Sequence, residues 1–253
     1  MFRSKKKHEF KKPASNYSEM LIGENTPFAI SESFKMLRQN LFFTSSGESC
    51  PVYAISSSYA HVGKSVIIAN TAASFAELGK KVLLIDADMR CPVLHRIFEK
   101  NAESGLSELL ASVTPVKEML DVSAAASGKS GLDLITSGRI PPNPSELLSS
   151  QRMEELIGLA KERYDVIFID MPPICEVSDA LAVSSFITGY IFAVRAGSTD
   201  DRSISNALDI LDQLGARVVG FVLNGVDPKS PGKTYGKYGK YGKYTYRRGD
   251  KEI

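Results

Sequence analysis

Long hydrophobic runs and paired cysteines are both missing from this sequence of 253 residues. No apolar run approaches the ~18–20 residues that a bilayer-spanning helix requires, so we expect no transmembrane segment. The first residues, MFRSKKKHEFKK, have no apolar segment behind them, and we therefore expect no secretory signal. Cys50, Cys91 and Cys175 are far apart and form no CxxC pair, so disulfides and a zinc site are not expected and a reducing cytoplasm fits.

The remaining composition is that of an ordinary globular protein, but the charge is unevenly distributed. Hydrophobic residues make up 43% and charged residues 24%, and the length suits one α/β domain with tails. Residues 1–13 carry six basic side chains against one acidic, and residues 229–253 carry eight against two. Residues 14–228 are left with 17 basic and 26 acidic side chains, so the positive charge lies in the two tails. Such tails bind anionic lipid, nucleic acid or acidic proteins, or are simply solvated.

A phosphate-binding loop is predicted within VYAISSSYAHVGKSV, residues 52–66. An apolar run rich in β-branched residues precedes small polar residues, then Gly63, Lys64 and Ser65, then a stretch with helical spacing. In such a loop the backbone N–H groups from Val62 to Val66 surround phosphates. The lysine reaches the β- and γ-oxygens, and the serine hydroxyl meets Mg²⁺.

This loop departs from the full pattern G-x-x-x-x-G-K-[ST] at its first position. Ser58 stands where that pattern has glycine, and His61 occupies a second position where glycine is common. We expect the bulk of His61 to narrow the loop. The three residues Gly-Lys-Ser also occur by chance between a strand and a helix, so the loop needs support from elsewhere in the chain.

Carboxylates at the ends of two further strands supply that support. The runs VLLI and VIFI are typical of parallel strands buried on both faces. The first ends at Asp86 and is followed by Asp88 and Arg90, and the second ends at Asp170. Because ligands of open α/β sheets bind outside the carboxyl ends of the strands, these side chains should approach the loop. Mg²⁺ and Lys64 would compensate their charge, which predicts an ATP or GTP site.

The alternation of apolar runs and helical patterns predicts the fold class: α/β, with a doubly wound, mostly parallel sheet of the P-loop NTPase type. The helical spacing in residues 28–43 predicts a helix capped by Ser31 or Ser33, and another helix is expected from Asp179. We expect a basic irregular arm over residues 1–27, the nucleotide-binding domain with its first helix over 28–227, and a tail over 228–253.

The tail is basic, rich in glycine and tyrosine, and repeats YGK three times. Since it cannot bury enough apolar surface to offset its ordering entropy, we expect it to be disordered. It holds half of the chain's ten tyrosines: Tyr235, Tyr238, Tyr241, Tyr244 and Tyr246. These side chains are suited either to stacking on single-stranded nucleic acid or to accepting phosphate. Composition alone does not choose between these functions.

From about Ser31 to the end, the chain resembles the bacterial protein-tyrosine kinases of capsule and exopolysaccharide operons, P-loop proteins related to the septum-site and partition ATPases. The motifs that carry the resemblance are ISSSYAHVGKS, LLIDADMRCP, VIFIDMPP, SGRIPPNPSELL, VLNGV and the tyrosine cluster. The resemblance implies an ATP- and Mg²⁺-dependent kinase that phosphorylates tyrosines of its own tail in trans and of other proteins. A partition-type ATPase fits less well, because Tyr59 stands where that group's signature lysine falls.

The resemblance also implies partners. Glu32, Lys35 and Arg38 match a Glu-x-x-Arg-x-x-Arg motif of ring-shaped homo-oligomers, with lysine in place of the first arginine. Relatives of this length work with a separate transmembrane activator that recruits them to the inner face of the membrane, and with a cognate tyrosine phosphatase. Nucleic acid is not an expected partner under this interpretation. A nucleic-acid-binding ATPase and an inactive scaffold remain alternatives.

The site residues receive the following expected roles. Lys64 and the loop amides neutralise the phosphates, while Ser65, Asp88 and Asp170 serve Mg²⁺ directly or through water. Asp86 accepts the phenol proton, although Asp86 and Asp88 can exchange roles. Arg90 binds phosphates or braces the aspartates, and Asn224, at the end of the last expected strand, touches adenine.

Overall fold

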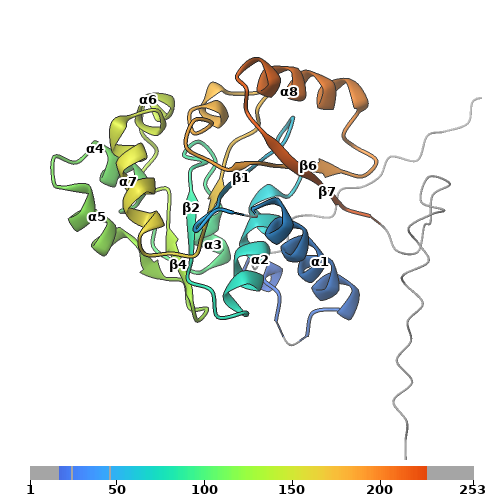
Figure 1. The fold of residues 1–253 in the computed structure, drawn as a ribbon, viewed down its shortest axis with the longest axis horizontal. Helices are drawn as coiled ribbons and strands as arrows, with labels where there is room; N and C mark the ends of the chain where they lie inside the picture. The colour runs from blue at the N-terminus through green and yellow to red at the C-terminus, as the bar shows by residue number, and fades with distance from the viewer. Residues whose placement is uncertain (1–16, 24, 46, 227–253) are drawn as a thin grey trace, which may run out of the picture.

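A mostly parallel sheet of seven strands runs through the centre of the protein (Figure 1). The computed structural model describes residues 17–23, 25–45 and 47–226. The strand order is β3-β4-β2-β5-β1-β6-β7, and only the short edge strand β3 is antiparallel to its neighbour. The strands are β1 (Val52–Ser56), β2 (Val82–Asp86), β3 (Ala125–Ala126), β4 (Leu132–Ile135), β5 (Val166–Asp170), β6 (Gly189–Arg195) and β7 (Val218–Asn224).

Helices cover both faces of this sheet. One face packs against α1 (Phe28–Thr44), α2 (Lys64–Ala76) and α3 (Leu94–Ile97). The other packs against α4 (Leu106–Ala111), α5 (Val116–Ser123), α6 (Pro144–Leu148), α7 (Gln151–Lys161) and α8 (Asp201–Gln213). Two short 3₁₀ helices, η1 (Tyr17–Met20) and η2 (Ser178–Leu181), complete the described elements.

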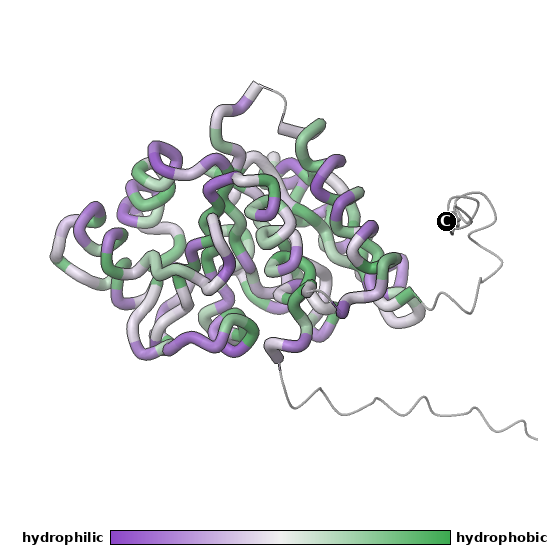
Figure 2. The backbone as a smooth tube through the Cα atoms, turned by 90° about the horizontal axis from the view of Figure 1, so that it is seen from below, coloured by the Kyte–Doolittle hydropathy of each residue, from purple (hydrophilic) through white to green (hydrophobic). Residues whose placement is uncertain are grey.

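The alternation of side chains along each strand produces two separate hydrophobic cores. In β5, Ile167 and Ile169 join the core under α4–α8, whereas Val166 and Phe168 join the core under α1–α3. All five β5 residues are buried, as expected for a strand covered on both faces. Hydrophobic residues accordingly gather in the interior (Figure 2). The predicted doubly wound α/β fold is confirmed.

Two local predictions about helices were wrong. The first helix begins at Phe28 after Pro27 and has no side-chain cap, so neither Ser31 nor Ser33 caps it. Pro27 lacks an N–H group and suits a helix start. The helix expected from Asp179 is only the single turn η2, followed by further turns. Among the described residues, no helix has both the length and the apolar character needed to cross a bilayer.

The segment before α1 packs onto α2 through Asn70. The Asn70 side chain accepts the Ile22 N–H at 2.7 Å and donates to the Met20 carbonyl at 2.9 Å. The Arg96 guanidinium lies 5.7 Å from the centre of the Tyr17 ring. Residues 17–22 therefore have defined contacts with the domain body, although residues 1–27 were expected to be irregular.

Candidate nucleotide site

The predicted phosphate loop connects β1, an inner strand between β5 and β6, to the N-terminus of α2. Gly63 precedes α2 with φ +97°, a conformation that favours glycine, and no side chain caps the helix. Lys64 and Ser65 are the first two helical residues, and Lys64 is buried. The uncapped amides and the helix dipole make this end of α2 suited to an anion.

Asn224 holds the end of β7 against the phosphate loop. Its Nδ2 donates a hydrogen bond of 2.8 Å to the Val62 carbonyl, and its Oδ1 accepts the Gly225 N–H. A Cβ atom at Gly63 would overlap with Asn224 Nδ2, so glycine is required there for close approach as well as for its positive φ. The expected contact of Asn224 with adenine stays a prediction.

The two non-glycine positions of the loop are accommodated differently. Ser58 is buried, and its hydroxyl donates to the Ser203 carbonyl at 3.0 Å, so the extra polar group is satisfied. His61 has φ +62°, which explains why glycine is favoured at this position, since few other residues adopt that conformation readily. Its side chain is exposed and its carbonyl accepts a hydrogen bond from Arg195. The imidazole is therefore exposed to solvent, and the expected narrowing of the loop by His61 stays a prediction.

Asp86 and Asp170 lie side by side at the carboxyl ends of β2 and β5. They are partners in the parallel register, and Ile55 of β1 pairs with Asp170 from the other side. Both carboxyl groups are fully buried. Asp86 Oδ2 accepts the Leu94 N–H at 3.1 Å, whereas Asp86 Oδ1 and both Asp170 oxygens have no hydrogen-bond partner within the described part of the chain. Buried oxygens left in this state indicate a site built for another group.

Burial raises the pKa of both carboxyl groups. Burial, followed by the neighbouring charge of Asp170, raises the pKa of Asp86 well above its usual range. Burial also raises the pKa of Asp170, although Lys64 and the nearby Ser65 hydroxyl oppose that shift. The same two effects, desolvation and a charged partner, are typical of functional sites.

Asp88 and Arg90 follow Asp86 in the loop after β2. Asp88 is buried and accepts the Cys91 N–H at 3.1 Å. Burial raises the pKa of Asp88, and the charge of Lys64 partly offsets this. Arg90 makes a two-pronged ion pair with Asp179, through Nε at 2.7 Å and Nη2 at 3.1 Å. The guanidinium therefore pairs with Asp179 and not with Asp86 or Asp88.

The residues at this edge fit a Mg²⁺ ion that is held mainly by nucleotide and water oxygens. No group of three His, Cys, Asp or Glu side chains within the described ranges is arranged to hold a metal alone. The unpartnered oxygens of Asp170 and the neighbouring hydroxyl of Ser65 are hard oxygen donors, which Mg²⁺ prefers. Mg²⁺ usually retains several waters in such phosphate sites, so a complete protein cage is not needed.

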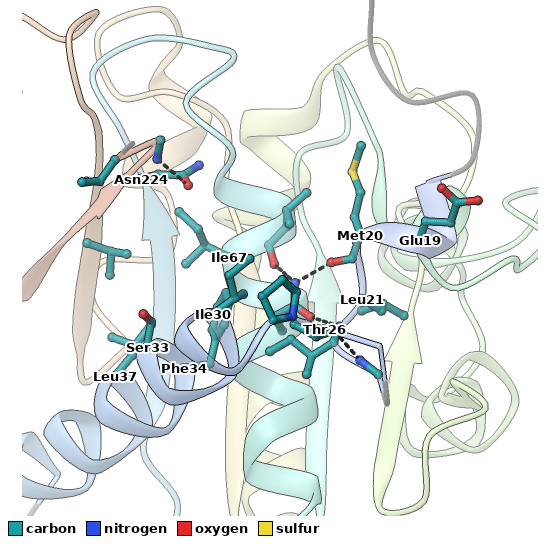
Figure 3. A pocket seen from close by; sticks show the side chains of 18 of the residues that line it. Glu19, Met20, Leu21, Thr26, Ile30, Ser33, Phe34, Leu37, Ile67 and Asn224 are labelled. Atoms are coloured by element: carbon teal, nitrogen blue, oxygen red, sulfur yellow. Dashed lines mark hydrogen bonds between the residues drawn. The ribbon is translucent and has the colours of Figure 1, made fainter. Parts of the chain in front are cut away.

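A large, mainly apolar pocket lies beside the phosphate loop, between α1, α2 and the end of β7 (Figure 3). Its volume is about 890 Å³. Ile30, Phe34 and Leu37 of α1 line one side, Ile67 of α2 lines another, and Asn224 lies at one end. Asn224 therefore lines this pocket and also contacts the phosphate loop.

The residues of the expected oligomerisation motif are engaged within the chain. Lys35 Nζ lies 2.7 Å from Glu32 Oε1 on the same helix, and the Arg38 guanidinium donates to the Ser74 carbonyl of α2. The five tail tyrosines lie outside the described residues.

Three residues around the site were missed by the sequence analysis. Asp179 had been expected only as a helix start, but its carboxylate accepts hydrogen bonds from Arg90 and from Ser145. Glu176 accepts the Ala60 N–H of the phosphate loop at 2.8 Å. No motif indicated these roles, because the contacts join segments that are far apart in the chain.

The fold and the loop define a nucleotide-binding domain of the P-loop class, and a comparison of the sequence with family models agrees. Residues 51–188 match a family described as an AAA domain. The septum-site-determining protein MinD of Pyrococcus horikoshii, solved with Mg-ADP, shares the fold. The TM-score is 0.57 at 20% identity, over 69% of this chain and 70% of that chain.

Closer relatives identify the family. The chain is 34% identical over 195 residues to the tyrosine-protein kinase YwqD of Bacillus subtilis, covering 77% of this chain and 81% of YwqD. It is 35% identical over 213 residues to the tyrosine-protein kinase Wzc of Salmonella typhi, covering 84% of this chain but only 29% of Wzc. The kinase domain of Escherichia coli tyrosine kinase ETK superposes with a TM-score of 0.75 at 33% identity, over 83% of this chain and 84% of that domain. The chain belongs to the bacterial tyrosine-protein kinase family.

Proposed function

We propose that this chain is an ATP-dependent protein-tyrosine kinase that phosphorylates its own tyrosine cluster in trans and tyrosines of other proteins, and so regulates capsular or exopolysaccharide synthesis and export. The observation that supports this most strongly is the meeting of three strand ends. The phosphate loop after β1, Asp86 after β2 and Asp170 after β5 are adjacent in the sheet.

The phosphate loop binds and orients the nucleotide in this proposal. Lys64 and the amides from Val62 to Val66 neutralise charge on the β- and γ-phosphates, and the γ-phosphoryl group passes in line to a tyrosine hydroxyl. Ser65 would hold Mg²⁺, with Asp88 and Asp170 acting on it directly or through water, and the ion would supply neutralisation of phosphate charge. In this proposal Asn224 contacts the adenine.

A carboxylate is needed to accept the proton of the acceptor tyrosine. Because the phenol pKa is near 10, little phenolate exists at neutral pH without a positioned base. Asp86 is the proposed base, since burial and then the charge of Asp170 raise its pKa well above its usual range, which makes its carboxylate a stronger proton acceptor. Asp88, the less deeply buried of the two, is the alternative base.

The proposed partners follow from the family and from α1. Exposed apolar side chains on α1, with Glu32, Lys35 and Arg38, would contribute to a ring-shaped homo-oligomer. A separate transmembrane protein would activate the kinase and recruit it to the cytoplasmic face of the membrane, and a tyrosine phosphatase would reverse the modification. Binding to nucleic acid is not part of the proposal.

A mixing experiment tests transfer between subunits. The full-length Lys64→Met variant is incubated with Mg-ATP and a chain that lacks residues 229–253 but retains Lys64. We expect phosphotyrosine on the Lys64→Met chain, and none when either protein is incubated alone. If the truncated chain hydrolyses ATP without labelling its partner, the partition-type ATPase becomes the better explanation.

A further inference from the structure

Asp179 joins three segments that are distant in the sequence. Its Oδ2 accepts Arg90 Nε at 2.7 Å, and its Oδ1 accepts Arg90 Nη2 at 3.1 Å. The Ser145 hydroxyl, at the start of α6, also donates to Oδ1. The loop after β2, the proline-rich loop before α6 and η2 therefore meet at one carboxylate.

The contact has the properties of a fixed, charged pair. The side chain of Asp179 is only 1% exposed, whereas that of Arg90 is 46% exposed. Although burial disfavours the charged carboxylate, the hydrogen bonds from Arg90 and Ser145 outweigh it and lower the pKa of Asp179. A two-pronged bond through Nε and Nη2 fixes the plane of the guanidinium.

Arg90 is still able to bind a further anion. Its hydrogen bonds to the described residues go to Asp179 through Nε and Nη2, which leaves Nη1 available. Asp88 lies close enough to affect the Arg90 pKa, and Lys64 in turn affects that of Asp88. Arg90 follows Asp86 and Asp88 in the loop after β2, so its half-exposed guanidinium lies at the strand-end edge that carries the phosphate loop. A guanidinium suits phosphoryl oxygens.

We propose that Asp179 is a positioning residue: with Ser145 it holds Arg90 so that Nη1 contacts the γ-phosphoryl group of the nucleotide. This inference rests on the proposed nucleotide site. It assigns a role to a carboxylate that touches neither phosphate nor metal, and it explains why a buried charge is retained behind an exposed arginine.

Nucleotide binding by the full chain tests this role independently of kinase activity. The affinities for ADP and for AMP-PNP, both with Mg²⁺, are measured by calorimetry for Asp179→Asn, Arg90→Ala and the double variant. A lost charge-assisted hydrogen bond should weaken AMP-PNP binding by about 10-fold in each single variant. The ADP affinity should change by less than about twofold, and the double variant should lose no more than Arg90→Ala alone.

Several outcomes would overturn the proposal. One is an equal loss of ADP and AMP-PNP affinity, which would indicate general damage to the site. A second is that the single variants still prefer AMP-PNP over ADP as strongly as the unmodified chain does. A third is that the losses of AMP-PNP affinity in the two single variants multiply in the double variant. If Asp179→Asn does not fold, Ser145→Ala and Arg90→Lys replace it, and both should lower AMP-PNP affinity selectively. Selective loss in a protein that forms no phosphotyrosine would retain this inference and refute only the proposed kinase activity.

Discussion

At the scale of single residues, backbone conformation explains the unusual phosphate loop. Gly63 and His61 both have positive φ, but only Gly63 also faces a close neighbour, the Asn224 amide. His61 turns its imidazole to solvent. A side chain is therefore tolerated at position 61 at the cost of some backbone strain, whereas position 63 requires glycine.

This difference predicts the effect of substitutions at His61. His61→Gly should raise the free energy of unfolding by at most about 1 kcal/mol, because the strain it relieves is partly offset by the flexibility of the unfolded chain. Its ADP affinity should stay within about twofold. His61→Val is the matched control and should lower stability, since a β-branched residue adopts this conformation poorly. Denaturant unfolding and calorimetry measure both effects. A large gain in ADP affinity from His61→Gly would contradict the observed direction of the imidazole.

The buried carboxyl groups predict a dependence of stability on pH. The folded-state pKa of Asp86 lies above its unfolded value, because of burial and the charge of Asp170. The folded state therefore holds an extra proton, and the stability this provides is lost as the pH rises from about 4 through the raised pKa. This pair of carboxyl groups should therefore lower the stability of the nucleotide-free protein more at neutral pH than near pH 4.

Asp86→Asn should consequently stabilise the nucleotide-free protein at pH 7 by about 1–3 kcal/mol, since an uncompensated buried charge is costly. The gain should shrink as the pH approaches 4. Thermal melting between pH 4 and pH 7 measures this gain, since each kcal/mol should shift the melting temperature by about 2–4 °C. Asp209→Asn, on the exposed side of α8, is the control and should have almost no effect. A gain that grows toward acid pH would refute the explanation.

Carboxylates at strand ends could be predicted from the sequence, whereas the contacts of Arg90 could not. Asp86 and Asp170 each end a continuous apolar run, and parallel strands place such ends at one edge. The pairing of Arg90 with Asp179 spans 89 positions and depends on the path of two loops. The path of a loop leaves no periodic pattern in the sequence, so a contact between two loops cannot be predicted from such a pattern.

At the scale of elements, helices were predicted well where their apolar spacing is strong and poorly where turns compete. The helix at residues 28–43 is present as α1, although neither Ser31 nor Ser33 caps it. The stretch after Asp179 forms successive i to i+3 turns, including Ala182 N–H to the Asp179 carbonyl and Ser184 N–H to the Leu181 carbonyl. Asp179 itself is bound to Arg90 instead of capping a helix.

The outer face of α1 predicts self-association. Met36 and Phe43 are 65% and 72% exposed, and both line a shallow groove next to Lys35 and Arg38. The double variant Met36→Glu/Phe43→Glu should shift the protein to lower mass in sedimentation velocity, because charges would replace an apolar contact surface. Its ADP affinity should stay within about twofold.

Val122→Glu is the control for this experiment. Val122 is also an exposed apolar side chain, at 77%, but it belongs to α5 on the opposite face of the sheet. Its substitution should leave the mass unchanged. If the control dissociates the protein and the α1 variant does not, the interface lies elsewhere.

At the scale of the whole molecule, one sheet edge gathers the chemistry and the tail provides its proposed acceptor. Three strand ends place Lys64, Asp86 and Asp170 together, and the fold matches that of the ETK kinase domain. The sequence predicted this arrangement because the strands are parallel and adjacent. The tail lies outside the described residues, so the assignment of its tyrosines as acceptors rests on the sequence and on the family.

Mapping phosphate on the purified full-length chain after incubation with Mg-ATP tests the kinase assignment most directly. We expect phosphotyrosine among Tyr235, Tyr238, Tyr241, Tyr244 and Tyr246, detected by mass spectrometry, and none in Lys64→Met. Calorimetry on the same sample shows whether Mg-ATP binds. Binding of Mg-ATP without any phosphotyrosine in residues 235–246 would contradict the account.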